Sequence, residues 1–167
     1  MSRDLPSELH VRTVLYKGPN RAGKLEVLLL HGTELRSNYR LPGGRILAET
    51  GETLSRGLRR ILREQIGWVD GREFNYANLR QAWNDIRTEA RSTGNVSTTQ
   101  MLFIGRYAAS SQVDMQSVVR AGFGGASWLP LPDAVHAVRE DIPFRAGVSY
   151  VNARQPWNTA LPIAIFS

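Results

Sequence analysis

The residues that could do chemistry in this chain are gathered between positions 41 and 68, in the segment LPGGRILAETGETLSRGLRRILREQIGW. Carboxylate oxygens bind hard divalent cations such as Mg²⁺, and the planar guanidinium of arginine suits phosphate groups. The chain has no cysteine, which excludes disulfides, thiolate metal sites and thiol nucleophiles. Any chemistry here therefore uses oxygen and nitrogen groups. In this segment those groups belong to Arg45, Glu49, Glu52, Arg60, Glu64 and Gln65.

The spacing of these residues resembles the Nudix box, G-x5-E-x7-R-E-U-x-E-E-x-G-U, in which U is aliphatic. Seven residues separate Glu52 from Arg60, and the frame then continues through Glu64, Gln65 and Gly67. In that box, carboxylates one turn apart on a helix hold Mg²⁺ against a pyrophosphate, while a glycine turn lets a backbone carbonyl reach the metal. The resemblance implies an α+β fold, the Nudix-type α/β/α sandwich with a mixed β-sheet.

The chain departs from this box at telling positions. The glycine turn lies two residues too far from Glu52, Ile61 replaces the first glutamate of the Arg-Glu pair, and Gln65 replaces the last glutamate. On a helix, Ile61 falls beside Leu58 and Leu62, so it widens the apolar face where an active box keeps a carboxylate. The box is degenerate, and its helix is predicted to be more structural than catalytic.

The GDP-mannose mannosyl hydrolases also carry a degenerate Nudix box, and this chain resembles them more closely. The resemblance covers about residues 25 to 150, and the stretch from the Pro-Gly-Gly turn to Gly67 is its specific part. The shared features are Pro42-Gly43-Gly44-Arg45, Glu52-Thr53-Leu54, Arg60 before an aliphatic residue, a polar residue and then Gly67, the stretch 96–107, and Trp128-Leu129 followed by Asp133.

This resemblance implies roles for individual residues. Arg45 matches an arginine that contacts the diphosphate of the substrate, and Gln65 stands where the family has a metal-binding glutamate. The glycine turn at Gly43 and Gly44 would supply a backbone ligand. The family's Gln-His pair, a metal ligand and general base, has no counterpart here, because residues 121–127 (AGFGGAS) contain no titratable side chain.

The positions that would select the substrate also differ from the family. Gln100 stands where the family has a histidine, and Arg12 stands where it has an aspartate that reads the base. The implied substrate class is a nucleoside diphosphate linked to another group, with nucleotide sugars as one example, and its identity stays open.

The first functional hypothesis is a Nudix hydrolase that cleaves such a molecule with the help of Mg²⁺ or Mn²⁺. Glu52, Arg60 and Glu64 would be catalytic, with Arg60 orienting the box, while Arg40 and Arg45 would bind the substrate's phosphates. The two extra loop residues could bring a loop glutamate into the place of the lost helix glutamate. The predicted metal ligands are Gly44, Glu49, Glu52, Glu64 and Gln65.

The second hypothesis is a binding module that keeps the Nudix fold without catalysis and recognises a nucleotide, an RNA or a protein partner. The formal charge of +6, with 19 arginines and 2 lysines, favours anionic partners. The box helix carries an arginine-rich face, which either pairs with local acids such as Glu49 and Glu52 or contacts phosphates. That face consists of Arg56, Arg59, Arg60 and Arg63.

The elements that must position these residues follow from periodicity and turn signals. Apolar residues recur at helical spacing from Thr53 to Ile66, with Thr53 as the N-cap and Gly67 as the stop. Residues 39–45 are predicted to run from a short strand into a glycine turn. Residues 73–83 fit a strand followed by a turn, although residues 82–91 could also form a short helix. Further strands are expected at 9–16, 25–30, 96–107, 127–129 and 161–166, and further helices at 112–120, 132–139 and 144–151.

Length and composition set the remaining expectations. With 167 residues, 42% hydrophobic and 22% charged, the chain is predicted to fold as a single Nudix-like domain over 1–167. No apolar run approaches the roughly 18 residues of a membrane-spanning helix, and no signal-peptide pattern is present, so a cytoplasmic location is expected. A homodimer is expected from the family resemblance.

Overall fold

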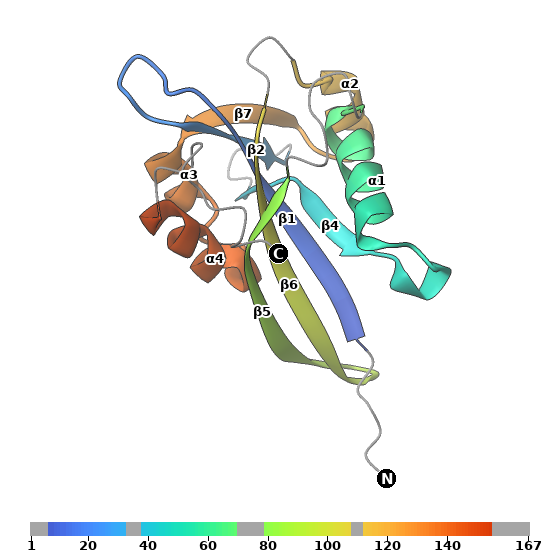
Figure 1. The fold of residues 1–167 in the computed structure, drawn as a ribbon. Helices are drawn as coiled ribbons and strands as arrows, with labels where there is room; N and C mark the ends of the chain where they lie inside the picture. The colour runs from blue at the N-terminus through green and yellow to red at the C-terminus, as the bar shows by residue number, and fades with distance from the viewer. Residues whose placement is uncertain (1–6, 33–37, 70–78, 108–111, 155–167) are drawn as a thin grey trace.

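The computed structural model describes residues 7–32, 38–69, 79–107 and 112–154. In this part of the chain, a mixed β-sheet lies between two layers of helices, as Figure 1 shows. The predicted α+β class and α/β/α sandwich are confirmed. None of the helices in these ranges is long and apolar enough to cross a membrane.

Seven strands form the sheet within the described residues. They are β1 (Ser7–Lys17), β2 (Glu26–His31), β3 (Tyr39–Arg40), β4 (Gly43–Ile46), β5 (Arg80–Arg91), β6 (Gly94–Arg106) and β7 (Gly125–Pro130). The order is β3-β2-β1-β6-β5, while β4 pairs with β1 and β7 pairs with β2. The β1–β6 pair is parallel and the other pairs are antiparallel. Strand β1 lies at the centre of the sheet, because it pairs with β2, β4 and β6.

The helical layers pack on opposite faces of this sheet. The helices are η1 (Ala48–Thr50), α1 (Leu54–Ile66), α2 (Met115–Arg120), α3 (Leu131–Ala137) and α4 (Ile142–Ala153). Because side chains alternate along a strand, β1 contributes to both layers. Its Val14 packs in a cluster with Leu131 and Val148 of the α3–α4 layer, and its Leu15 packs with Leu62 of α1 and Val118 of α2.

Helix α1 confirms the prediction for the box helix. The Thr53 side chain accepts a hydrogen bond from the backbone N–H of Arg56 at 3.2 Å, which caps the first turn. Gly67 ends the helix with a φ of 71°, a left-handed conformation that glycine adopts readily. The apolar face is buried, as its spacing predicts, through Leu58, Ile61, Leu62 and Ile66.

The short-helix alternative for residues 82–91 is wrong, because these residues belong to β5. They pair with β6 in a long hairpin, with Asp85 opposite Gln100 and Arg91 opposite Gly94. Strand β5 is at the edge of the sheet, and most of its residues after Trp83 are exposed. An exposed edge strand needs few apolar residues, so periodicity alone does not reveal it.

The Gly43-Gly44 pair lies in a strand rather than in a turn, which corrects the prediction for residues 39–45. Gly43 begins β4 and pairs with Arg12 of β1. A Cβ on Gly43 would overlap the carbonyl oxygen of Val11, so only glycine permits this close approach between β4 and β1. The strand expected at 161–166 lies outside the described residues.

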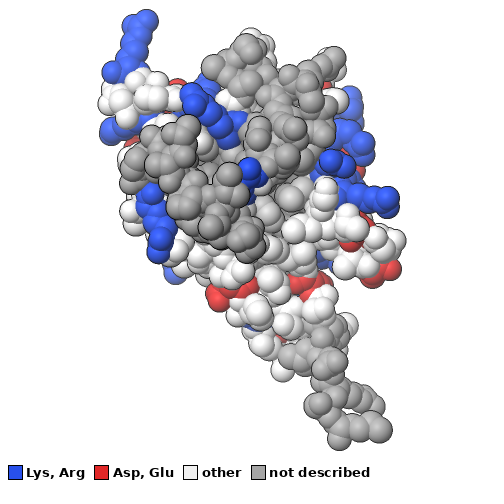
Figure 2. Space-filling model, in the orientation of Figure 1, with Lys and Arg blue, Asp and Glu red and all other residues white. Residues whose placement is uncertain are grey.

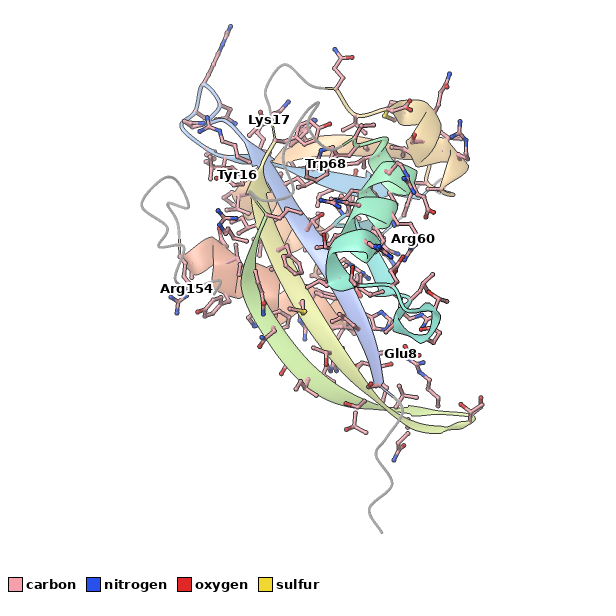
Figure 3. All side chains as sticks on the ribbon, turned by 45° about the vertical axis from the view of Figure 1, so that its right-hand side comes forward. Glu8, Tyr16, Lys17, Arg60, Trp68 and Arg154 are labelled. Carbon is pink, nitrogen blue, oxygen red and sulfur yellow. The ribbon has the colours of Figure 1, made fainter. Side chains whose placement is uncertain are left out.

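The long axis of β1 separates two polar ends of the molecule. Figure 3 shows Glu8 near the start of β1 and Tyr16 and Lys17 at its other end, with Trp68 close to that second end and Arg60 between them on α1. Strand β4 of the box segment pairs with residues 9–12, in the first half of β1. The candidate site is therefore built on the most central strand of the sheet.

Candidate functional site

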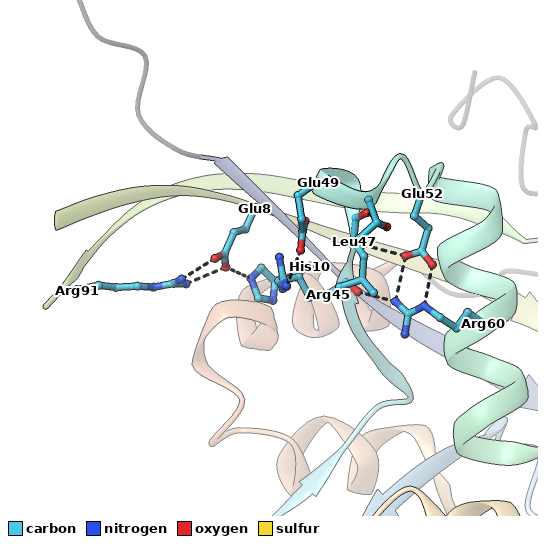
Figure 4. Close-up of polar contacts among 9 residues, drawn as sticks. Glu8, His10, Arg45, Leu47, Glu49, Glu52, Arg60 and Arg91 are labelled. Carbon is cyan, nitrogen blue, oxygen red and sulfur yellow. Dashed lines mark hydrogen bonds and ion pairs between the residues drawn. The ribbon is translucent and has the colours of Figure 1, made fainter. Parts of the chain in front are cut away.

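The Glu52–Arg60 pair holds the box loop against helix α1 (Figure 4). Arg60 donates from Nε to Glu52 Oε2 at 2.7 Å and from Nη2 to Glu52 Oε1 at 3.0 Å, and Nη2 also donates to the Arg45 carbonyl at 2.9 Å. Glu52 Oε1 accepts a further hydrogen bond from the Leu47 N–H at 2.9 Å. The Arg60 and Leu47 donors lower the pKa of Glu52, and Glu52 in turn raises the pKa of Arg60. The pair has the geometry of a structural clamp.

Gly57 lets α1 lie close to this clamp. A Cβ at this position would overlap Ile46 Cδ1 and would lie 2.9 Å from Glu52 Oε1. A side chain at position 57 would therefore force Ile46 or Glu52 to shift beside the clamp. The sequence gives no signal for this role, since an isolated glycine in a helix usually reads as a small cost in helix propensity.

The other predicted carboxylates are also held by arginines. Glu49, in η1, accepts from Arg45 Nη2 at 2.9 Å; its pKa is lowered by its own backbone N–H and then by Arg45. Glu64 lies 3.5 Å from Arg60 Nη1 and is 58% exposed. In the described ranges, no three or more His, Cys, Asp or Glu residues lie together in a way that could hold a metal ion. The structure thus pairs Glu49, Glu52 and Glu64 with guanidinium groups.

Gln65 makes a double contact with the backbone of Gly43. Its Oε1 accepts from the Gly43 N–H at 3.0 Å, and its Nε2 donates to the Gly43 carbonyl at 2.7 Å. The Gly43 carbonyl also accepts from Arg40 Nη2 at 3.2 Å. Both ends of the Gln65 amide are used, and the Gly43 carbonyl faces two N–H donors. Gly44, the predicted backbone ligand, packs against Ile61 of α1.

These residues do not fit the Mg²⁺ site of the Nudix box. An octahedral Mg²⁺ needs oxygen ligands and usually one or two carboxylates. Here the oxygen of Gly43 points at N–H groups, the amide of Gln65 presents a hydrogen where a glutamate presents an oxygen, and Ile61 is buried in the core. The donor set of this chain is therefore unsuited to a divalent cation at that position.

A positively charged patch lies beside Gly43, on the side away from the clamp. Arg40 of β3 lies with its guanidinium carbon 5.6 Å from the centre of the Phe123 ring, and its Nε is buried without a hydrogen-bond partner. Burial first, and then the nearby charge of Arg12, lower the pKa of Arg40 to about 10, while Asp141 acts in the opposite direction.

Arg12 is the second cation of this patch and, unlike Arg40, it has an acidic partner. Its Nε donates to Asp141 Oδ2 at 3.0 Å, its Nη1 donates to the Val11 carbonyl at 2.9 Å, and its guanidinium carbon lies 4.6 Å from the centre of the Phe144 ring. Asp141 therefore pairs with Arg12 and acts on Arg40 only through its nearby charge. We call Arg12, Arg40, Phe123 and Asp141 the arginine patch.

The sequence indicated Arg40 and Arg12 as candidates, but it gave no role beside them to Asp141 or Phe123. Asp141 is 129 positions away from Arg12 in the chain, and Phe123 follows α2, so only the tertiary fold brings them together. Gln100, the other changed family position, is buried on β6, where its Nε2 donates to Thr98 Oγ1 at 2.6 Å and its Oε1 has no partner.

The arginine-rich face of α1 forms a separate surface. Figure 2 shows Lys and Arg atoms over the side of the molecule that α1 occupies. Arg56, Arg59 and Arg63 are exposed there, while Arg60 turns towards Glu52 and is 25% exposed. The predicted pairing of this face with local acids is thus found at Arg60.

Comparisons with known proteins give a fold and no closer relative. No protein-family model and no curated protein sequence matches this chain. Similar solved structures include an Ap4A hydrolase of C. elegans in a binary complex, at 16% identity over 87% of this chain and 96% of that chain, with a TM-score of 0.58. The NUDIX domain of NrtR from Shewanella oneidensis, complexed with ADP ribose, is 18% identical over 88% of each chain, with a TM-score of 0.52.

A third similar structure is a complex of MERS1 of T. brucei with RNA, at 15% identity over 82% of this chain and 56% of that chain, with a TM-score of 0.61. Identities this low show the architecture alone. The chain has the α+β fold of Nudix proteins.

Proposed function

We propose that this protein is a Nudix-fold module that binds a nucleotide-type ligand through its phosphates, without a divalent metal and without hydrolysis. The observation that carries this proposal is the double hydrogen bond between the Gln65 amide and the Gly43 backbone. In the Nudix box, a metal ion bridges a helix glutamate and a glycine carbonyl at this position. Here the hydrogen bonds of Gln65 bridge the helix and the glycine instead.

An amide N–H and a metal cation compete for the same lone pairs of a carbonyl oxygen. The Nε2 of Gln65 lies 2.7 Å from the Gly43 oxygen, and Arg40 Nη2 approaches the same atom. A carbonyl oxygen has two lone pairs, so these two donors already use its hydrogen-bonding capacity. These contacts stabilise the fold. They also place N–H groups at the carbonyl oxygen where a metal ion would bind.

The remaining carboxylates support the same conclusion. Activating water at a Nudix box requires acids that are available to a metal or to a proton. Glu52 is engaged by Arg60 and Leu47, and the low pKa of Glu52 keeps it ionised and bound to them. The box frame of Glu52 and Arg60 is therefore kept as a structural element.

The ligand class rests on charge and on the neighbours. Solved structures with this fold hold ADP ribose and RNA, and this chain carries a formal charge of +6 with the arginine patch beside the box. Nucleotide sugars, which the resemblance to GDP-mannose mannosyl hydrolases suggests, belong to the same class. Arg45 would contribute to their binding by exchanging Glu49 for a phosphate, since both side chains are partly exposed.

Calorimetry with the purified chain tests this proposal. We expect ADP-ribose, GDP or a nucleoside diphosphate sugar to bind in the presence of EDTA, and we expect no heat from Mg²⁺ or Mn²⁺ up to millimolar concentrations. A phosphate-release screen over nucleoside diphosphate sugars and dinucleotides should show no turnover. Turnover that Glu64→Ala abolishes would establish the hydrolase instead, and an RNA oligomer bound in preference to every mononucleotide would overturn the assigned ligand class.

A further inference from the structure

Arg40 of β3 is half-buried and has no acidic partner among the described residues. Arg12, Arg60 and Arg91 each lie within 3.0 Å of a carboxylate oxygen. For Arg40, no carboxylate of the described residues is within ion-pair distance; its one hydrogen bond goes to a neutral carbonyl at 3.2 Å, and its Nε is buried and unsatisfied. A guanidinium has five N–H donors, so most of the donors of Arg40 are unused.

This arrangement is unfavourable for the folded chain on its own. A partly buried charge without a partner is unfavourable, and neighbouring like charges add to that cost. The lowered pKa of Arg40 reports both effects, since burial and Arg12 each disfavour its charged form. Asp141 offsets only part of this effect, because it already accepts the Nε of Arg12 at 3.0 Å. Among the described residues, no carboxylate binds Arg40 directly.

The chemistry of the patch indicates which anion fits. Two guanidinium groups attract a doubly charged group more strongly than a single carboxylate, and the guanidinium fork matches the oxygens of a phosphate. The rings of Phe123 and Phe144 flank the two guanidinium carbons at 5.6 and 4.6 Å, so they limit the access of water and strengthen an ion pair formed there.

We propose that Arg40 is the anion receptor of this protein: its guanidinium directly binds a phosphate group of the ligand beside Gly43 and Phe123, in the role that a metal ion plays in a Nudix hydrolase. Arg12, held by Asp141, adds charge to the same group. The identity of the ligand as a nucleotide rests on the proposed function. The binding of an anion at Arg40 rests on the arginine patch alone. Neither the box motif nor the arginine-rich face of α1 is needed for it.

Two variants separate this role from a structural one. Arg40→Met removes the charge and keeps the unbranched stem that packs on Phe123, and Arg63→Met removes an exposed charge from α1 as the matched control. Isothermal calorimetry in EDTA uses inorganic phosphate, pyrophosphate, GDP and ADP-ribose as probes. We expect Arg40→Met to weaken the binding of each phosphate probe by roughly 10-fold to 100-fold, as the loss of a charge-assisted hydrogen bond does, and Arg63→Met to change it by less than about twofold.

Stability without ligand gives the second measurement. Because Arg40 is a cost to the folded chain when no anion is bound, Arg40→Met should unfold in urea at the same concentration as the wild type or at a higher one. A lower midpoint, with unchanged binding of all probes, would show that Arg40 supports the fold and would overturn the inference.

The probes also separate this inference from the proposed function. Inorganic phosphate or pyrophosphate bound through Arg40, with no nucleotide bound, would support the receptor and overturn the proposed ligand class. Nucleotides bound equally by the wild type and Arg40→Met would support the proposed function and overturn the receptor. If the wild type binds none of the four probes, both are overturned.

Discussion

The two sides of Gly43 differ in how they balance charge. On the side of η1 and α1, each of Glu49, Glu52 and Glu64 has an arginine within 3.5 Å. On the side of β3, the guanidinium of Arg40 has no carboxylate partner among the described residues. The box side has the sequence signal and pairs its acids with its own arginines, whereas the β3 side has almost no motif and keeps unused donors on Arg40. In the proposed function, the ligand binds mainly where donors are unsatisfied rather than at the acids of the motif.

Among the variants considered, Glu52→Gln is expected to lower the stability of the fold the most, and it tests whether the box side is held by its own ion pairs. The change leaves the partly buried Arg60 guanidinium without its carboxylate and disturbs the Leu47 N–H contact. We expect the free energy of unfolding to fall by about 2–4 kcal/mol, as measured by urea denaturation. A loss below about 0.5 kcal/mol would mean that the Glu52–Arg60 clamp is not structural.

Gly57→Ala tests the same clamp from the helix side. Alanine improves helix propensity by up to about 1 kcal/mol, but its Cβ would overlap Ile46 and crowd Glu52 Oε1. We expect a net loss of about 1–2 kcal/mol in the free energy of unfolding, because overpacking outweighs propensity. A more stable variant would show that α1 can move away from β4 at little cost.

Glu8→Gln extends the comparison to another paired carboxylate. Hydrogen bonds from Arg91 and then from His10 lower the pKa of Glu8 from 4.5 to about 2. A lowered folded-state pKa stabilises the protein above the unfolded-state value, and the gain is lost as the pH falls from about 4.5 to about 2. Urea midpoints should therefore favour the wild type over Glu8→Gln at pH 7, and the two proteins should converge near pH 2. Equal midpoints at pH 7 would contradict the pairing.

Glu64→Ala should have the smallest effect. Its carboxylate is 58% exposed and lies 3.5 Å from Arg60, which keeps its bonds to Glu52. Exposed ion pairs contribute little, so we expect a change within about 0.5 kcal/mol in urea denaturation. A larger loss would show that Glu64 supports the Glu52–Arg60 clamp and is not a weakly paired surface acid.

The sequence predicted the elements whose signals are local. Helix α1 follows from the 3.6-residue spacing of its leucines and isoleucines and from Thr53 and Gly67 at its ends. The strand at β6 follows from its β-branched and aromatic residues. Pairing of the arginine-rich face with local acids such as Glu49 and Glu52 was one of two alternatives, and Arg60 is found paired with Glu52.

What the sequence could not predict depends on residues far apart in the chain. The strand conformation of Gly43 is set by the carbonyl of Val11 on β1, and the open state of Arg40 is set by the commitment of Asp141 to Arg12. The polar outer part of β5 shows its strand character only through its pairing with β6. Each of these features comes from tertiary contacts rather than from local pattern.

The contact between Gln65 and Gly43 has a consequence for how the helix is attached to the sheet. A side-chain amide presents an N–H donor beside a carbonyl acceptor, so Gln65 pairs with the Gly43 N–H and C=O as a residue of a neighbouring strand would and extends the β4 ladder from α1. The Gly43 amide proton is then protected from solvent by a helix side chain rather than by a strand. Its rate of hydrogen–deuterium exchange reports the undocking of α1, and comparison with amides inside α1 distinguishes movement of the whole helix from its unwinding.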